Sequence, residues 1–191
     1  REITPDVKLL ARDLRLKARP TAAARAGDVV LRIDRELDTV GKSGYRLKIA
    51  RKLTVTARSS QGLFYGGRTL LQLFDDRKRT APRGSASDYP TYTERGLMID
   101  NGRQFFTRAW LTERIKEMSG LKLNLLHLHF SDNQGFRIES KTHPEIVSDP
   151  HLTHADIRSL VAVARRHHVT IVPELDSPGH MEAALANHPE L

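Results

Sequence analysis

The second half of the chain alternates apolar strands with helical stretches, and this rhythm constrains the fold more than any other feature of the sequence. Apolar runs at residues 96–99, 123–130 and 169–172 are separated by stretches of helical spacing at 109–118 and 153–168. Nearly continuous apolar strands that alternate with helices are typical of a parallel sheet covered by helices and joined by right-handed crossovers. The pattern predicts an α/β domain, and it fits a closed barrel and an open doubly wound sheet equally well.

The first half predicts a small α+β domain. Residues 28–34, 45–49 and 53–57 alternate apolar and polar side chains with the period of half-buried strands. Glycines between the first two runs and a basic pair between the last two favour an antiparallel meander. Apolar residues at mostly helical spacing follow at 63–74, behind two serines that can cap the start of a helix. We therefore expect one antiparallel sheet covered by one helix.

Residues 75–91 carry charged residues, proline, glycine and serine with little apolar content. This composition is typical of a connection between domains. We therefore place an accessory domain, including the connection, at residues 1–90 and the α/β domain at residues 91–191.

Composition excludes several classes of protein. A chain of 191 residues with 39% hydrophobic and 28% charged residues can bury one sizeable core or two small ones. It has no apolar run of about 18 residues for a membrane span. Its first residues lack the apolar segment of a secretory signal, so we expect a mature or trimmed product. The absence of cysteine removes disulfides and thiolate metal sites and leaves the compartment open, a secreted or extracytoplasmic one included.

The net charge of +8 raises the question of nucleic-acid binding. Nucleic-acid sites gather Lys and Arg on one face, often with aromatic residues between them. Here the basic residues are dispersed along the chain, without interleaved aromatics or a basic helix face. We expect a solvated basic surface and no nucleic-acid partner.

Polar side chains follow each predicted strand of the α/β domain. They are Asp100, Asn101 and Arg103 after the first strand, Ser131, Asp132, Asn133 and Gln134 after the second, and Glu174, Asp176 and His180 after the third. The carboxyl ends of parallel strands are where both α/β architectures build their active sites. Residues 174 and 176 are two apart at a strand end, so we expect their carboxylates to face the same side.

Three sequence blocks resemble family 20 glycoside hydrolases, the β-N-acetylhexosaminidases. They read RGLMIDNGR at 95–103, HLHFSDNQGFR at 127–137 and PELDSPGH at 173–180, in the order and at the spacing of that family. Residues 62–66 also resemble a stretch of the family's accessory domain. The resemblance covers roughly residues 28–191. It implies an α+β accessory domain followed by the first three strands of a (β/α)8 TIM barrel, a fold that usually needs about 250 residues.

The resemblance implies removal of terminal N-acetylglucosamine or N-acetylgalactosamine from oligosaccharides or glycoconjugates, with no cofactor and no metal. The anomeric configuration is retained, because the acetamido oxygen of the substrate attacks the anomeric carbon. In the family an Asp orients the acetamide and an adjacent Glu protonates the leaving oxygen, both after the fourth strand. Residues 1–191 contain no such Asp–Glu pair. We therefore expect a polypeptide limited to these residues to be an inactive fragment.

Three strands of a barrel also leave two open sheet edges, through which we expect such a fragment to associate with itself. On the inner face of the sheet we expect uncovered apolar positions such as Leu126, Leu128 and Ile171.

The resemblance implies roles for five of the strand-end residues. Arg103 would bind hydroxyls of the nonreducing terminal sugar, a task that suits the planar and permanently charged guanidinium. Asp132 and His180 would form a pair that supports the general acid, since a carboxylate that fixes one imidazole nitrogen selects the tautomer. Glu174 and Asp176 would orient His180 and the neighbouring loops.

Each of these residues also has a purely structural interpretation. Arg103 could pair with Asp100, Asp132 could cap a turn or helix, His180 could begin a helix, and Glu174 and Asp176 could form salt bridges with Arg137 or Arg165. The sequence also departs from the family at two positions, because Phe136 stands where a Trp is expected and Asn133 where an Asp is frequent. The pocket around these two residues should differ accordingly.

Two other functions compete with the glycosidase. His127 and His129 share one face of a strand, as in metal-dependent amidohydrolases, but there the pair belongs to the first barrel strand and here it lies on the second. Buried, hydrogen-bonded histidines are the favoured interpretation. The third hypothesis is a carbohydrate-binding module without the catalytic pair, which depends on the sequence downstream of Leu191.

Overall fold

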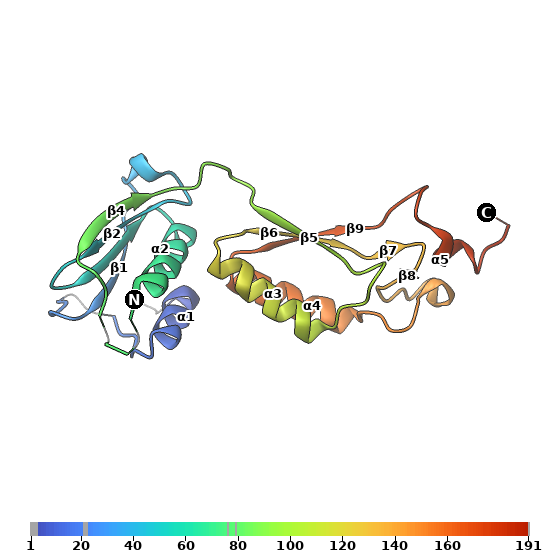
Figure 1. The fold of residues 1–191 in the computed structure, drawn as a ribbon, viewed down its shortest axis with the longest axis horizontal. Coiled ribbons are helices and arrows are strands. Elements are labelled where there is room, and N and C mark those ends of the chain that lie inside the picture. Colours follow the sequence, from blue (N-terminus) through green and yellow to red (C-terminus); the bar gives the residue numbers. More distant parts are fainter. Residues whose placement is uncertain (1–3, 21–22, 76, 79, 191) are drawn as a thin grey trace. The chain divides into compact units, whose positions relative to one another are not determined.

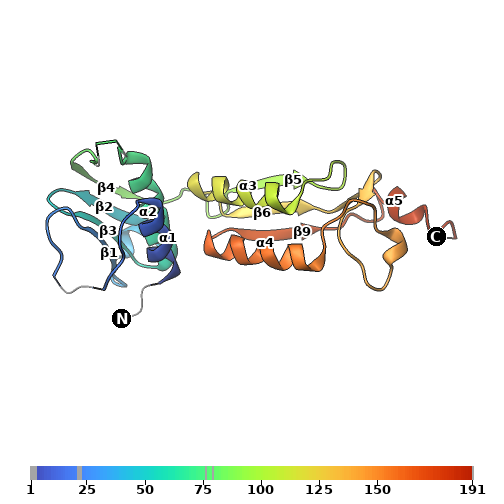
Figure 2. The same cartoon turned by 90° about the horizontal axis from the view of Figure 1, so that it is seen from below.

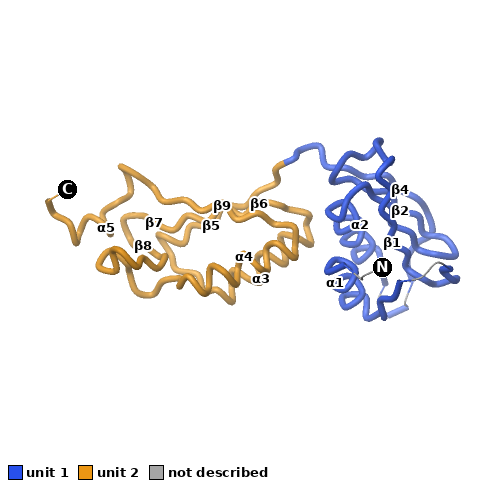
Figure 3. Tube along the Cα trace, turned by 180° about the vertical axis from the view of Figure 1, so that it is seen from behind, with its two compact units in different colours: residues 1–93 blue, residues 94–191 orange. Residues whose placement is uncertain are grey.

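The computed structural model describes residues 4–20, 23–75, 77–78 and 80–190. The start of the chain and two positions of the predicted connection lie outside the described residues. The chain divides into two compact units, residues 1–93 and 94–191, which Figure 3 colours separately. Each unit has its own sheet and its own hydrophobic core, so each is described by itself.

The first unit contains a four-stranded sheet in the order β1-β3-β2-β4 (Figure 1). Its strands are β1 (Val29–Ile33), β2 (Tyr45–Ile49), β3 (Leu53–Ala57) and β4 (Gly84–Asp88). β2 is antiparallel to both β3 and β4, whereas β1 is parallel to β3. The predicted antiparallel meander is therefore wrong at β1. The connection at residues 34–44 runs from the end of β1 past the end of β3 to the start of β2, so β3 lies between these two strands and is parallel to β1.

Strand β4 (Gly84–Asp88) lies inside the segment that the sequence assigns to an interdomain connection, and this prediction is also wrong. The strand pairs with β2 from Gly84 opposite Ile49 to Asp88 opposite Tyr45. Its residues are small and mostly exposed, so the strand contributes backbone pairing with β2 rather than core side chains. A hydrophobic pattern therefore cannot reveal it.

Helices α1 (Pro5–Asp13) and α2 (Ser60–Leu73) belong to this unit, and α2 packs on the sheet. The predicted start of α2 is confirmed, because the Ser59 side chain accepts a hydrogen bond from the backbone N–H of Gly62. A Cβ atom at Gly66 would lie 2.4 Å from Val55 Cγ1, so α2 lies closer to the sheet than a side chain there would permit. Helix α1 was not predicted from the sequence, since its basic residues obscure the two leucines that reach the core.

The second unit contains three parallel strands in the order β5-β6-β9, as predicted. The strands are β5 (Gly96–Asp100), β6 (Leu125–His129) and β9 (Thr170–Glu174). Helices α3 (Arg108–Gly120) and α4 (His154–Arg166) lie side by side on one face of this sheet, as Figures 1 and 2 show together. The parallel sheet covered by helices is therefore confirmed.

The two faces of this sheet differ in character. Leu126 and Leu128 are fully buried in the core that α3 and α4 form with the sheet, and Ile171 packs against the same core. The prediction that these positions point to the uncovered inner face is wrong. Successive side chains of a strand point to opposite faces, and the predicted face is the one that the neighbouring residues occupy. The opposite face instead carries Met98 and Val172, which are 46% and 38% exposed.

The chain forms short elements beyond the carboxyl ends of the strands. They are the hairpin of β7 (Ser131–Asp132) and β8 (Gly135–Phe136), the 3₁₀ helix η2 (Pro144–Ile146) and helix α5 (Glu182–Leu185). The sequence predicts only a long loop between β6 and α4, because strands of two residues carry no periodic pattern. Among the described residues, none of the helices is long and apolar enough to cross a membrane.

Candidate active site at the carboxyl ends of the strands

Three chemically active side chains lie in register at the last positions of the three parallel strands. Asp100 pairs with His129 across β5 and β6, and His129 pairs with Glu174 across β6 and β9. Side chains two residues apart on a strand share a face, so all three point to the same side as Met98 and Val172, away from the helices. Strand order and register thus gather two carboxylates and an imidazole on the open face of the sheet.

Asp132 is the centre of this cluster. Its side chain is only 1% exposed, and its Oδ2 atom lies 2.9 Å from Arg103 Nη2 and 3.0 Å from His129 Nε2. Its Oδ1 atom accepts a hydrogen bond from the backbone N–H of Asn133 at 2.7 Å and lies 3.3 Å from His180 Nδ1. A buried carboxylate costs much free energy unless it is paired and hydrogen-bonded, and these four contacts supply that compensation.

Arg103 links two carboxylates. Its Nη1 atom donates to Asp100 Oδ2 at 2.7 Å, its Nη2 atom reaches Asp132, and its backbone N–H donates to Asp100 Oδ1 at 2.9 Å. The hydrogen bond with Asp100 raises the pKa of Arg103 above its ordinary value. Half of the side chain, 49%, remains exposed. The predicted structural pairing with Asp100 is thus present, and it leaves guanidinium surface accessible to a ligand.

Gly102 allows the loop after β5 to lie directly against β7. A Cβ atom at this position would lie 2.9 Å from the backbone N of Asp132 and 2.9 Å from the carbonyl carbon of Ser131. Backbone atoms at that distance would have to shift. The absence of a side chain at Gly102 therefore sets the separation between Arg103 and Asp132.

His180 reaches Asp132 from the loop after β9. Its backbone has a φ of 58°, the left-handed region that costs a residue with a side chain about 1 kcal/mol. The imidazole is 46% exposed and turns Nδ1 toward Asp132 Oδ1. Because Nδ1 faces the carboxylate, Nε2 is the ring atom left to meet a further group. The structure brings together Arg103, Asp132 and His180 as the sequence predicts.

Glu174 contacts the histidines of β6. Its Oε2 atom lies 2.7 Å from His127 Nε2 and 2.9 Å from His129 Nδ1. Both contacts are ion pairs without the angle of a good hydrogen bond, since neither Glu174 Oε2 nor His129 Nδ1 has a hydrogen-bond partner among the described residues. The predicted role of Glu174 in orienting His180 finds no contact in the described residues. Nor does Glu174 form the alternative salt bridge with an arginine there.

Asp176 joins this region through its backbone and its charge. Its N–H donates to Ser131 Oγ at 3.1 Å, which fixes the loop after β9 to the hairpin. Its carboxylate lies with His129 and Glu174 in a group whose nitrogen and oxygen atoms are within 4.8 Å of one another. Asp100, His129 and Asp132 form a second such group. The two carboxylates of Glu174 and Asp176 therefore face the same side, as the spacing predicts.

The two β6 histidines differ in exposure. His129 is buried between Asp132 and Glu174, with 4% of its side chain exposed, whereas 38% of the His127 side chain is exposed. The prediction of buried histidines therefore holds for His129 and fails for His127. His127 belongs to neither of these two groups, so the described residues do not gather the histidine pair in one set of possible metal ligands.

Two buried polar residues at the strand ends fix the loops of the site. Asn101 is fully buried and its Oδ1 atom accepts a hydrogen bond from the backbone N–H of Phe106, which fixes the loop after β5. Ser131 is also buried and accepts the hydrogen bond from Asp176. Their position directly after a buried strand places both among the polar strand-end residues of the sequence, which assigns neither of them a role.

Burial and pairing shift the pKa values of the central pair in opposite directions. Burial raises the pKa of Asp132, but the N–H of Asn133, the imidazole of His129 and nearby positive charges outweigh it and hold the pKa below its ordinary value. Burial lowers the pKa of His129, but its contacts with Asp132 and Glu174 outweigh it and hold the pKa above its ordinary value. At mildly acidic pH the pair is a carboxylate against an imidazolium.

The complete protein should therefore be most stable between about pH 4 and pH 6.5. The stabilising contribution of Asp132 is present above its unfolded pKa and is lost as the pH falls through the lower folded value. The contribution of His129 is present below its unfolded pKa and is lost as the pH rises through the higher folded value. Urea unfolding midpoints measured from below to above this pH range test the expectation. In a His129→Gln variant the decline on the alkaline side should become shallower, and an unchanged slope would contradict the assignment.

Comparison with known proteins identifies the family. Residues 92–191 match the model of the glycosyl hydrolase family 20 catalytic domain, and residues 4–89 match the model of domain 2 of the same family. A β-hexosaminidase of Porphyromonas gingivalis is 29% identical over 100% of this chain and 28% of its own length. A β-N-acetylhexosaminidase of Cellulomonas fimi is 34% identical over 93% of this chain and 40% of its own length.

A solved structure shows the same fold. A mutant β-hexosaminidase of Streptomyces plicatus in complex with its product GlcNAc superposes with a TM-score of 0.85, at 32% identity, over 98% of this chain and 42% of that protein. The chain thus spans between 28% and 42% of the length of these three proteins. Because both family models match along nearly its whole length, the chain belongs to glycosyl hydrolase family 20.

Proposed function

We propose that the complete protein is a β-N-acetylhexosaminidase that removes terminal N-acetylglucosamine or N-acetylgalactosamine with retention of configuration. Residues 1–90 would supply its accessory domain and residues 91–191 the first three strands of its (β/α)8 barrel. The observation that carries the proposal is the buried Asp132 carboxylate, which holds Arg103, His129 and His180 together at the carboxyl ends of three parallel strands. The GlcNAc bound to the Streptomyces plicatus relative supports the choice of sugar.

Arg103 would bind the nonreducing terminal sugar. A guanidinium has five N–H donors, and the contacts with Asp100 and Asp132 use only part of them. The two carboxylates fix the orientation of the guanidinium, so that little side-chain entropy is lost when a sugar hydroxyl binds. The half-exposed position of the side chain leaves the remaining donors accessible.

Asp132 and His180 would act on the general acid. With Nδ1 held by the charged Asp132, His180 can present Nε2 to a carboxylic acid that reaches the site from a later part of the protein. The family mechanism takes its nucleophile from the substrate's own acetamido oxygen, so the enzyme needs the acid and the positioning groups rather than a second nucleophilic carboxylate. Glu174 would serve this pair indirectly, by holding His129 against Asp132.

Hydrolysis of a chromogenic N-acetyl-β-glucosaminide by the full-length protein tests the proposal. We expect turnover, with the β-anomer of the sugar as the first product detected by NMR, because retention follows from two successive inversions. The matching β-glucoside, which lacks the acetamido group, should be inert. A first product with the α configuration, or equal hydrolysis of both substrates, would reject the mechanism.

A polypeptide limited to residues 1–191 should give no turnover above the buffer blank, because it lacks the Asp–Glu pair expected from the family resemblance. If the full-length protein binds N-acetylglucosamine but hydrolyses nothing, the carbohydrate-binding module becomes the better description.

A further inference from the structure

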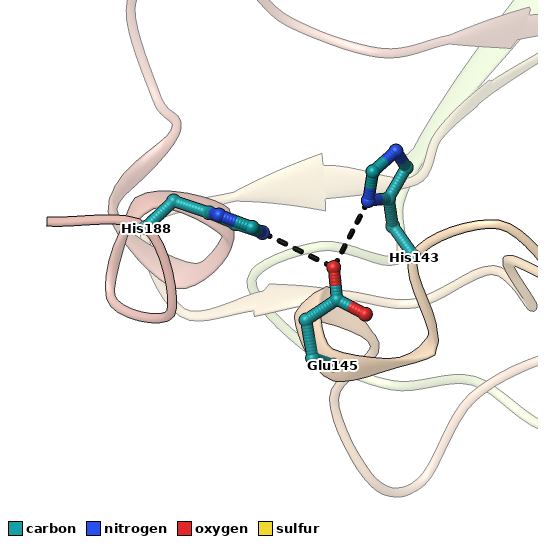
Figure 4. A group of neighbouring side chains, drawn as sticks. All are labelled: His143, Glu145 and His188. Atoms are coloured by element: carbon teal, nitrogen blue, oxygen red, sulfur yellow. Dashed lines mark hydrogen bonds and ion pairs between the residues drawn. The ribbon is translucent and has the colours of Figure 1, made fainter. Parts of the chain in front are cut away.

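A second cluster of ionisable side chains lies outside the strand-end site. His143 and Glu145 are at the start of η2, and His188 lies in the turn after α5; Figure 4 shows the three side chains converging. His143 Nδ1 lies 3.0 Å from Glu145 Oε1, and His188 Nε2 lies 3.1 Å from the same oxygen. Residues 145 and 188 are 43 positions apart in the chain, so only the fold brings them together.

The spacing of these atoms is close to that of a metal site. In a tetrahedral zinc site with metal–ligand distances of about 2.0–2.2 Å, neighbouring ligand atoms are about 3.3 Å apart. The two nitrogen–oxygen separations here are only a few tenths of an ångström shorter, and the three ligand atoms lie within 4.8 Å of one another. A small widening of the cluster would admit an ion at its centre.

The ligand set also selects a class of metal. Two imidazole nitrogens and one carboxylate oxygen suit zinc and neighbouring divalent transition metals, whereas calcium and magnesium prefer oxygen ligands alone. The three side chains are 61%, 40% and 28% exposed, so an ion could enter from solvent and complete its coordination with water.

A fourth residue supports this reading independently. Glu190 Oε1 lies 3.0 Å from His188 Nδ1, the ring nitrogen that does not face Glu145. Histidines that bind metals generally donate their other ring N–H to a carboxylate, which fixes the tautomer and the orientation of the ring. With Nδ1 held by Glu190, the lone pair of a metal-bound His188 would be on Nε2, the atom that meets Glu145. The backbone of His143 is fixed as well, since its N–H donates to Ser140 Oγ.

We propose that His143, Glu145 and His188 bind a divalent transition-metal ion of the zinc class, with Glu190 holding His188 in place. The ion would join the segment around η2 to the segment after α5. It shares no residue with the strand-end site, so the proposal stands apart from the glycosidase function. Because the ion binds the folded arrangement alone, it should raise the thermal unfolding temperature of the protein.

Zinc titration of the chelator-treated full-length protein by calorimetry tests this proposal. The wild type should bind one equivalent of Zn²⁺ more than the His188→Ala variant, so that zinc sites elsewhere in the protein cancel in the comparison. Glu190→Gln should weaken binding at this site by about 10- to 100-fold. His154→Ala is the matched control, because His154 is a partly exposed histidine beside Glu139 that belongs to no group of possible metal ligands among the described residues. It should leave the zinc stoichiometry and affinity unchanged.

A second measurement keeps the test decisive if the His188→Ala variant does not fold. Co²⁺ added to the chelator-treated wild type should give the visible absorption bands of a site with nitrogen and oxygen ligands. His143→Ala should abolish these bands without changing the circular dichroism spectrum. Equal Zn²⁺ stoichiometry and affinity in the wild type and in the folded variants would overturn the proposal.

Discussion

The Asp132→Asn variant of the complete protein should lose about 10²-fold or more of its turnover, the range that a general acid–base group contributes. Asparagine has nearly the same shape as aspartate but no charge, so Arg103, His129 and His180 would lose the anion that holds them. Asp132 is ionised at both pH 5 and pH 7, because its pKa is held below the ordinary value of an aspartate. The loss of turnover should therefore be equal at pH 5 and pH 7. The fall of the rate at acidic pH that protonation of Asp132 causes in the wild type should be absent in the variant. Initial rates across pH, with circular dichroism as the folding check, measure this.

His180→Ala and the double variant show whether the two residues act as one unit. Asp132 and His180 are in direct contact, and the effects of residues in contact usually fail to add. We expect the double variant to lose hardly more turnover than Asp132→Asn alone. If the loss in the double variant equals the product of the two single losses, the two residues act separately and the proposed pair is wrong.

The Arg103→Ala variant should lose about 10²-fold in kcat/KM, mainly through a higher KM. The proposed contact is with sugar hydroxyls remote from the breaking bond, so the ground state and the transition state lose the same interaction. Arg103→Lys keeps the charge without the planar fork and should recover only part of the loss. Steady-state kinetics on the chromogenic substrate measure kcat, KM and kcat/KM for each variant.

Arg108→Ala is the matched control for this experiment. Arg108 is 51% exposed and paired with Asp156, much as Arg103 is 49% exposed and paired with Asp100, but it is the first residue of α3 and contacts Asp156 and Ser159 of α4. Its kinetic parameters should remain those of the wild type. Values for Arg103→Ala within twofold of the wild type would remove Arg103 from the sugar site.

Local signals in the sequence predicted the second unit well. Its three strands are continuous apolar runs, and the intervening helices leave a parallel arrangement as the economical solution. The start of α4 is predicted by the spacing of Thr153 and Asp156, which in the structure form a reciprocal capping box. Such features depend on neighbours a few residues away, and a sequence displays them directly.

The sheet of the first unit could not be predicted in the same way. The preference for hairpins between neighbouring strands predicted that β1 pairs with β2. In the structure β1 pairs with β3, a choice that depends on tertiary packing. The same limit applies to the site. Arg103, Asp132 and His180 could be named from the motif blocks, whereas the place of His129 between Asp132 and Glu174 depends on the register of three strands.

The alternation of side chains across the parallel sheet has a consequence for how such a protein can change. Leu126 and Leu128 face the helices, whereas His127 and His129 face the opposite side. Substitutions at the first pair alter the packing of the core and leave the charged cluster in place. Substitutions at the second pair alter the cluster and remove little apolar contact. Core packing and the charged cluster can therefore change independently along a single strand, the packing at even and the cluster at odd residue numbers.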